Sequence, residues 1–217
     1  MNTLTTEPVA PLLERLFQEA EAGAAALNAM ADPGLMAMMR SKTDYRELYQ
    51  RLSAFPLPVS RDTGTLLYML ARSSGARTVV EFGTSFGIST LHLAAALRDN
   101  GGGRLITSEF EPSKAQRALQ NLAAGGLLDL VELREGDALQ TLSADLPATI
   151  DLVLLDGAKS LYPEILALLQ HHLRPGAIIV ADNAEHSPEY LQRVRAANGG
   201  YVSTPFAADV EVSMWLG

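Results

Sequence analysis

Acidic and amide side chains stand at the ends of four short apolar or β-branched runs in this sequence of 217 residues. They are Glu81, Glu109, Asp156 and the pair Asp182 and Asn183. A single Asp, Glu or Asn after a strand is most often the cap of the following helix. In an open α/β sheet, however, the ligand binds outside the carboxyl ends of the strands, so four such ends direct their acids toward one crevice. The coincidence favours a shared ligand-binding site.

The segment 81–89, Glu-Phe-Gly-Thr-Ser-Phe-Gly-Ile-Ser, indicates the kind of ligand. Gly83 and Gly87 frame a tight turn where the backbone can pass close to a ligand, and the helix that opens at Gly87 presents free N–H groups to it. This pattern predicts an adenosine-type ligand. Glu109 closes the second strand, where a carboxylate can accept hydrogen bonds from both hydroxyls of a ribose. That role fits NAD and S-adenosylmethionine equally.

The sequence of the turn at Gly83 to Gly87 distinguishes between NAD and S-adenosylmethionine. Binding of a dinucleotide requires G-x-G-x-x-G, whereas Thr84, Ser85 and Phe86 stand between the only two glycines here, so the cradle for a pyrophosphate is missing. The segment also lacks the Gly-Lys-Ser/Thr of a P-loop. Both observations favour S-adenosylmethionine.

The elements that must position these residues alternate between strands and helices. Strands are predicted at 78–82, 104–108, 130–134, 150–155 and 177–181, with helices at 87–97, 112–123, before Leu173 and at 188–197, and two further apolar stretches at 201–204 and 210–216. Such alternation is typical of a doubly wound, mostly parallel α/β sheet. Helical patterns at 9–30, 45–52 and 60–73 precede it. We expect an N-terminal helical extension at 1–54 and a sheet domain at 55–217.

The amino-acid composition excludes several classes of binding partner and of chemistry. The formal net charge of −8 argues against a nucleic-acid or anionic-membrane surface, which needs clustered Lys and Arg. The absence of cysteine excludes disulfides, thiolate metal sites and a cysteine nucleophile. The N-terminus has no basic start followed by an apolar stretch, and no later apolar run is long enough to span a bilayer. We therefore expect a cytoplasmic protein that acts on small molecules.

Five segments together resemble the cation-dependent small-molecule O-methyltransferases, of which the catechol and caffeoyl-CoA enzymes are the best-known types. They are 81–89, Glu109 to Pro112, Gly136-Asp137-Ala138, Asp156 to Lys159 and Asp182-Asn183. The resemblance covers roughly residues 55–217. It implies the class I methyltransferase sheet, mostly parallel with one antiparallel C-terminal strand, and a homodimer formed through the N-terminal helices.

The resemblance also implies roles for individual residues. Around S-adenosylmethionine, Glu81, Gly83 and Ser89 would surround the methionine end, Glu109 would bind the ribose, and Asp137 and Ala138 would lie beside the adenine. Further cofactor-binding residues would be Ser85, Gly87, Gly136 and Asp156. A divalent cation, Mg²⁺ or else Mn²⁺ or Ca²⁺, would be bound by Asp156, Asp182 and Asn183. Lys159 matches the proposed general base, and Lys159, Asn183 and Glu211 would contact the substrate.

The residue types suit this chemistry independently of the family. Two carboxylates and an amide oxygen are hard ligands that leave coordination places for substrate oxygens. A phenol has a pKa of about 10, so ionising it at pH 7 costs roughly 4 kcal/mol, and a bound cation offsets much of this cost. Like charges near Lys159 would depress its pKa toward that of a base.

The expected function is therefore cation-assisted methylation of a vicinal hydroxyl on a small, aromatic molecule. Ser85, Ile88 and the pair Gly157-Ala158 replace larger or aromatic residues of the family and would open the pocket. Two alternatives stay open. One is a metal-independent methyltransferase of a natural-product or carboxylate acceptor, and the other is a non-catalytic protein that binds S-adenosylmethionine.

Overall fold

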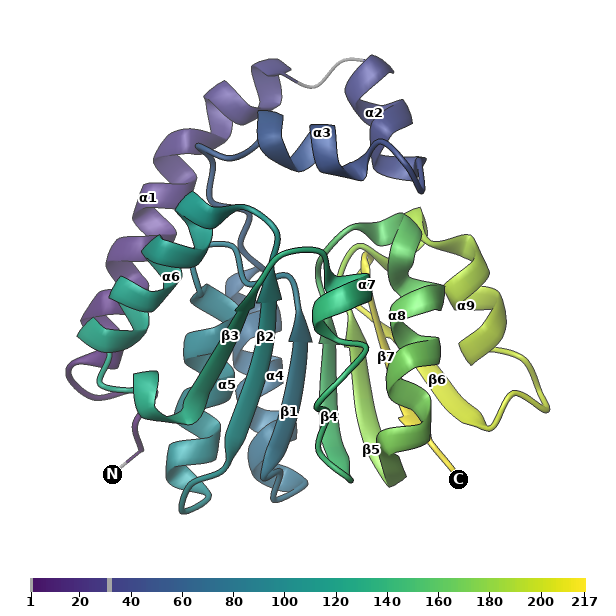
Figure 1. The fold of residues 1–217 in the computed structure, drawn as a ribbon. Coiled ribbons are helices and arrows are strands. Elements are labelled where there is room, and N and C mark those ends of the chain that lie inside the picture. Colours follow the sequence, from purple (N-terminus) through teal and green to yellow (C-terminus); the bar gives the residue numbers. More distant parts are fainter. Residues whose placement is uncertain (1, 31–32) are drawn as a thin grey trace.

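The computed structural model describes residues 2–30 and 33–217, in which a seven-stranded sheet carries helices on both faces (Figure 1). The strands are β1 (Thr78–Phe82), β2 (Arg104–Glu109), β3 (Val131–Glu135), β4 (Ile150–Leu155), β5 (Leu173–Ala181), β6 (Tyr201–Phe206) and β7 (Val210–Trp215). Their order is β3-β2-β1-β4-β5-β7-β6. Only β7 runs against its neighbours, since the pairs from β3 to β5 are parallel. The predicted doubly wound sheet with one antiparallel C-terminal strand is confirmed.

The strand order reverses between β1 and β4. Val80 of β1 lies opposite Ile106 of β2 on one side and opposite Val153 of β4 on the other. The connections after these two central strands therefore lead away in opposite directions, and such a reversal leaves a crevice at the carboxyl ends. The predicted acids follow the strands that border this crevice.

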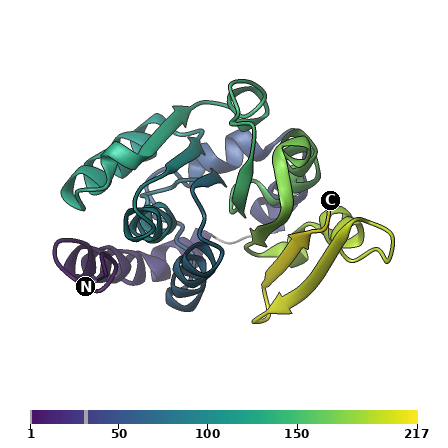
Figure 2. The ribbon, with the colours of Figure 1, turned by 90° about the horizontal axis from the view of Figure 1, so that it is seen from below.

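Helices cover both faces of the sheet and also its carboxyl edge. They are α1 (Val9–Met30), α2 (Pro33–Arg40), α3 (Tyr45–Arg51), α4 (Arg61–Ser73), α5 (Ile88–Asp99), α6 (Pro112–Ala124), α7 (Ala138–Thr141), α8 (Tyr162–Leu169) and α9 (Pro188–Val194). Figure 2 shows helices on the two sides of the twisted sheet, and Figure 1 shows α2 and α3 across the ends of the strands. Among the described helices, none has both the length and the apolar character needed to cross a membrane.

Two separate apolar clusters fix these layers. Leu67 and Leu93 from α4 and α5 pack with Leu105 of β2 on one face of the sheet. Ile165 and Tyr190 from α8 and α9 pack with other strand residues on the opposite face. All five side chains are fully buried. Because strand residues alternate between the faces, the β-branched runs read in the sequence supply both clusters.

The start of β5 differs from the expectation. The sequence predicts a turn at Pro175 and Gly176 and a strand only from Ala177, but β5 already begins at Leu173. Its register against β4 shifts between Ile150 and Leu152, so the proline lies in an irregular stretch of the ladder. A bulge tolerates the missing N–H of proline. The prediction of a turn at this point is wrong for that reason.

A comparison of two glycines, Gly83 and Gly102, tests how closely the turn after β1 approaches the loop after β4. Gly83 has φ +101°, and a Cβ there would meet backbone atoms of Asp156 and Gly157 at 2.7 Å, whereas Gly102 has φ +105° and open space around it. Gly102→Ala should cost about 1–2 kcal/mol through backbone strain alone. Gly83→Ala should lower the free energy of unfolding by roughly 1–3 kcal/mol more, because of overpacking. Urea denaturation followed by circular dichroism measures both, and equal losses would contradict the close approach.

Candidate functional site

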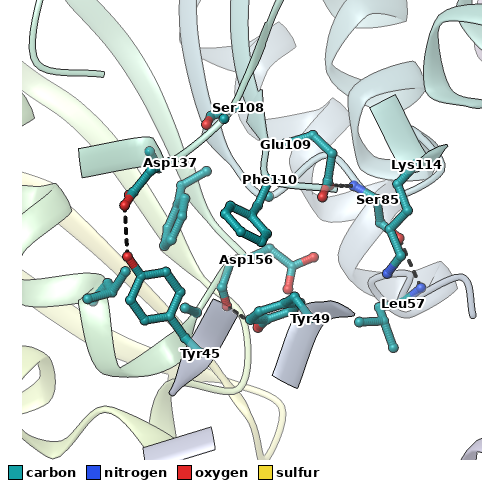
Figure 3. A pocket seen from close by; sticks show the side chains of 17 residues that line it. Tyr45, Tyr49, Leu57, Ser85, Ser108, Glu109, Phe110, Lys114, Asp137 and Asp156 are labelled. Carbon is teal, nitrogen blue, oxygen red and sulfur yellow. Dashed lines mark hydrogen bonds between the residues drawn. The ribbon is translucent and has the colours of Figure 1, made fainter. Parts of the chain in front are cut away.

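A cavity of about 560 Å³ lies at the carboxyl ends of β1, β2 and β4 (Figure 3). Seven of the residues predicted to hold the cofactor line it. They are Gly83, Ser85, Glu109, Gly136, Asp137, Ala138 and Asp156. The tertiary structure thus brings together residues from four separate loops.

The backbone positions these loops by continuing the strand pairing past the strand ends. Gly83 N donates to Ser108 O at 3.1 Å, and Gly136 N donates to Glu109 O at 2.8 Å. On the other side, Asp156 N donates to Phe82 O at 2.8 Å. Each loop therefore leaves the sheet in a fixed direction, and its side chains begin at fixed points around the cavity.

Glu109 fastens the glycine turn to the end of β2. Its carboxylate accepts hydrogen bonds from Ser85 N at 2.7 Å and from Glu111 N at 2.9 Å. The side chain is buried, and this burial raises the pKa of Glu109 although the N–H groups of Glu111 and Ser85 partly oppose the shift. A carboxylate has about four lone-pair positions, so Glu109 retains acceptor capacity for ligand hydroxyls.

Glu81, Gly87 and Ser89 lie beneath the turn and do not line this cavity. The fully buried carboxyl of Glu81 accepts hydrogen bonds at 2.6 Å from the hydroxyls of Ser89, Thr90 and Thr107. Gly87, with φ +85°, is the residue before α5. Ser89 and Ser85 both line a smaller cavity of about 180 Å³. In this structure, Glu81 supports the turn from below.

Asp137 connects the cavity to the N-terminal helices. Its Oδ1 caps α7 by accepting from Leu139 N at 3.0 Å. Its Oδ2 accepts from the Tyr45 hydroxyl at 2.9 Å and from Arg46 at 2.6 Å (Figure 3). Burial alone would raise the pKa of Asp137, but the bonds from Arg46, Leu139 and Tyr45 outweigh it and lower that pKa. Residues of α3 are therefore held over the cavity.

Sequence reasoning assigned no role to eight further residues that line the cavity, namely Tyr45, Tyr49, Leu57, Phe82, Ser108, Phe110, Lys114 and Leu161. The Tyr49 hydroxyl donates to Gly157 O at 3.0 Å, and burial raises the pKa of Tyr49 to about 12. Both tyrosines fit the helical pattern predicted at 45–52. No local signal in that pattern shows where the helix packs, so its contact with the sheet could not be predicted.

Asp156 and Asp182 form a buried acid pair where β4 and β5 end. Their carboxyl groups share a hydrogen bond, and both side chains have little exposure, 10% for Asp156 and 6% for the residue Asp182. Burial raises the pKa of Asp182 to about 8, and the charge of Asp156 adds to the shift. Two carboxyl groups this close share a proton rather than both ionising.

Lys159 lies against this pair. Its Nζ donates to Asp156 Oδ1 at 2.7 Å, and the side chain is buried. Burial by itself lowers the pKa of Lys159, but attraction to Asp156 outweighs burial and raises that pKa well above its ordinary value. The expected depression of the Lys159 pKa is thus not seen in the protein alone, where Asp156 holds the side chain as an ammonium.

Asn183 and Glu211 are placed differently from each other. Asn183 follows the acid pair with left-handed backbone, φ 48°, and its Nδ2 lies 3.5 Å from Asp209 Oδ2. Glu211 pairs with Arg195 at 2.6 Å and accepts from Ser203 Oγ at 2.5 Å. It does not line the cavity. In the pairing of β5 with β7, Glu211 lies opposite Ala181, two residues before Asn183 in the chain, while its carboxylate is engaged by Arg195 and Ser203.

The described residues contain no group of three or more His, Cys, Asp or Glu side chains arranged to hold a metal ion. The predicted metal ligands are two carboxylates and one amide. They therefore include only two side chains of the His, Cys, Asp or Glu types, one fewer than such a group needs. The acid pair at Asp156 and Asp182 is nevertheless in place.

Comparison with known proteins shows which proteins the chain is similar to. A model described as a methyltransferase domain matches residues 80–184. Catechol O-methyltransferase of Niastella koreensis is 37% identical over 130 residues, which are 58% of this chain and 58% of that protein. Catechol O-methyltransferase of Mycobacterium tuberculosis is 36% identical over 152 residues, 70% of this chain and 65% of that protein. Residues 80–184 thus match a methyltransferase domain, and the chain is similar to O-methyltransferases over a larger part of its length.

The fold of a solved O-methyltransferase is similar to that of this protein over nearly the whole chain. O-Methyltransferase TomG from Streptomyces achromogenes, in complex with S-adenosylmethionine and involved in tomaymycin synthesis, has 25% identity and a TM-score of 0.65. The superposition covers 92% of this chain and 98% of TomG. The curated relatives are matched over 58% and 65% of their own length.

The buried Glu81 should make stability depend on pH. Burial raises the pKa of Glu81 from 4.5 to about 7, although the bonds from Ser89, Thr107 and Thr90 oppose the shift. The folded protein then binds this proton more tightly than the unfolded chain. Its stabilising contribution is present below about pH 4.5 and is lost as the pH rises through about 7, a change of about 3 kcal/mol.

Glu81→Gln should remove this dependence, because glutamine keeps the shape and stays neutral. The free energy of unfolding of the wild type, relative to Glu81→Gln, should fall between pH 5 and 8 in urea denaturation. Exposed Glu135→Gln serves as the control and should give a constant difference. A constant difference for Glu81→Gln as well would show that Glu81 is ionised in the folded protein at pH 5.

Proposed function

We propose that this protein transfers a methyl group from S-adenosylmethionine to a hydroxyl oxygen of a small molecule, with the help of a divalent cation. One observation carries the proposal: seven predicted cofactor residues line a single cavity, and the cavity ends at Asp156, beside Lys159 and Asp182. The S-adenosylmethionine bound by TomG and the catechol O-methyltransferase names of two relatives support it.

The cofactor would lie with its ribose at Glu109 and its adenine near Gly136 and Ala138. Its methionine end would follow the turn at Gly83 toward Ser85, which lines both cavities. In this arrangement the methyl group is delivered toward Asp156. The residue types agree, because Gly83 leaves its backbone open to close approach by a ligand.

The acid pair fits a divalent cation. Asp156 and Asp182 are two hard oxygen groups that share one proton in a buried place, and a cation would replace that proton with more complete neutralisation. Asp156, Asp182 and Asn183 would hold the cation. When bound, it would lower the pKa of an acceptor hydroxyl and help to orient two neighbouring hydroxyls.

Lys159 would act as the general base that removes the proton of the acceptor hydroxyl. The attraction of Asp156 is what keeps Lys159 protonated here. Once the charge of Asp156 is engaged by another cation, burial dominates and lowers the pKa of Lys159, which is the direction that a general base requires. Its Nζ would then accept the hydroxyl proton as the methyl group passes from the cofactor's sulfur to the oxygen, with the C–S bond breaking as the C–O bond forms.

The surrounding residues would position the reactants and exclude water. Tyr49 closes the cavity from α3 through its bond to Gly157 O. Small side chains at Ser85, Gly157 and Ala158 leave room for a ring beside the cofactor. Methyl transfer needs an in-line arrangement of oxygen, carbon and sulfur in a dry site, so positioning supplies much of the rate. A catechol-like aromatic acceptor suits this space.

A metal test separates the proposal from its alternatives. Methyl transfer to a catechol panel should be lost with EDTA and restored by Mg²⁺, and Asp182→Asn should lower kcat by about 100-fold or more through lost electrostatic stabilisation. Calorimetry should show that Asp182→Asn binds S-adenosylhomocysteine within about twofold of the wild type. Exposed Glu185→Gln, a neighbour outside the acid pair, is the matched control and should keep full activity.

Activity that survives EDTA and Asp182→Asn would instead establish a metal-independent methyltransferase. Binding of S-adenosylhomocysteine without transfer to any acceptor would support the binding-protein alternative. Binding of NAD in place of S-adenosylhomocysteine would overturn the cofactor assignment.

Lys159→Met should lower kcat by about 100-fold or more, because general-base catalysis is worth that much, with little change in cofactor affinity. Lys159→Arg should not restore the rate, since a guanidinium does not give up its proton. Steady-state kinetics across pH 6 to 10 measures both variants. Full activity of Lys159→Arg would show that only the positive charge is needed and that Lys159 is not the base.

A further inference from the structure

Lys114 is a buried cation in the cofactor cavity that the proposed mechanism does not use. It is the third residue of α6, it lines the cavity, and only 2% of it is exposed. Within the described residues its Nζ makes neither a hydrogen bond nor a salt bridge, although Glu109, Glu111 and Asp156 attract it. A buried ammonium normally has a partner.

The position is unfavourable for a lysine on two counts. A cation in the first turn of a helix faces the positive end of the helix dipole. Burial also lowers the pKa of Lys114, and the attraction of Glu109 only partly offsets this. An aliphatic residue would avoid both costs, so the ammonium gains its partner only from something that enters the cavity.

Glu109 lies on the same side of the cavity as Lys114 and Ser85 (Figure 3). No hydrogen bond joins the two groups in the described residues; the carboxylate of Glu109 accepts from Ser85 N and Glu111 N and has acceptor positions left. An ionised carboxylate only accepts hydrogen bonds and an ammonium only donates them. A hydroxyl does both, so a hydroxyl-bearing ligand group between them satisfies both residues at once.

We propose that Lys114 binds the ribose of the cofactor together with Glu109. One ribose hydroxyl donates its hydrogen to Glu109 and accepts a hydrogen bond from Lys114 Nζ. This assignment rests on the proposed function, because it takes the ligand to be an adenosine derivative. It gives the cavity a specificity for an intact ribose diol, since a deoxyribose leaves a buried charge without its partner.

The test is a thermodynamic cycle that combines a change in the protein with a change in the ligand. Calorimetry measures the affinity of each protein for each ligand. The ligands are S-adenosylhomocysteine and its 2′-deoxy and 3′-deoxy analogues, and the proteins are the wild type and Lys114→Met. Lys114→Met should weaken S-adenosylhomocysteine about tenfold or more, the value of a hydrogen bond to a charged group. For at least one deoxy analogue, the same substitution should change affinity by less than about twofold.

Two further variants serve as controls for this interpretation. Lys114→Gln keeps a donor without the charge and should lose less affinity than Lys114→Met; it also replaces Lys114→Met if that variant does not fold. Lys42→Met removes a lysine that pairs with Glu164 and Glu189 outside the cavity. It should leave the affinity for all three ligands unchanged.

Equal losses with all three ligands would overturn the ribose contact and assign Lys114 to the shape of the cavity. An unchanged affinity for S-adenosylhomocysteine would overturn it as well. A wild type that binds S-adenosylhomocysteine while Lys114→Met binds it equally well refutes only this inference. A wild type that does not bind it at all refutes the proposed cofactor, and the ribose contact with it.

Discussion

The close approach of the turn after β1 to the loop after β4 is the constraint on which the candidate site depends. A Cβ at Gly83 would lie 2.7 Å from the backbone carbonyl of Asp156, so only glycine fits there. This contact places the turn predicted to hold the cofactor directly against the first acid of the proposed metal site. The parallel pairing of β1 with β4 enforces it, because Asp156 N continues the ladder to Phe82 O. Methyl donor and acceptor can therefore be held at one edge of one sheet.

Burial of charge at this edge gives the site its chemical character. Glu109, Asp156 and Asp182 are all largely removed from water, and burial raises the pKa of each. The protein compensates them only in part, through backbone N–H groups at Glu109 and through Lys159 at the acid pair. An incompletely neutralised group of carboxyls favours cationic ligands. Both a divalent cation and a sulfonium cofactor are of this kind.

The N-terminal helices complete the cavity from outside the sheet. Tyr45 and Arg46 bond to Asp137, from which they are 92 and 91 positions away in the chain. Tyr49 reaches Gly157 in the same way. The helical extension therefore contributes to the cavity, where α3 closes over the loops that follow β3 and β4.

The sequence by itself determined the sheet and the identity of most cavity residues. The β-branched runs, the two glycines and the acids at strand ends are local signals, and parallel strands bring their carboxyl ends to one edge. The sequence could not determine that Glu81 bonds hydroxyls beneath the turn, that Glu211 is held by Arg195, or that Tyr45, Tyr49 and Lys114 face the cavity. Those outcomes depend on which side chains meet across long separations, and helical periodicity alone does not specify them. Only the tertiary structure decided that the first helices and the sheet form one site, because that contact is a matter of packing.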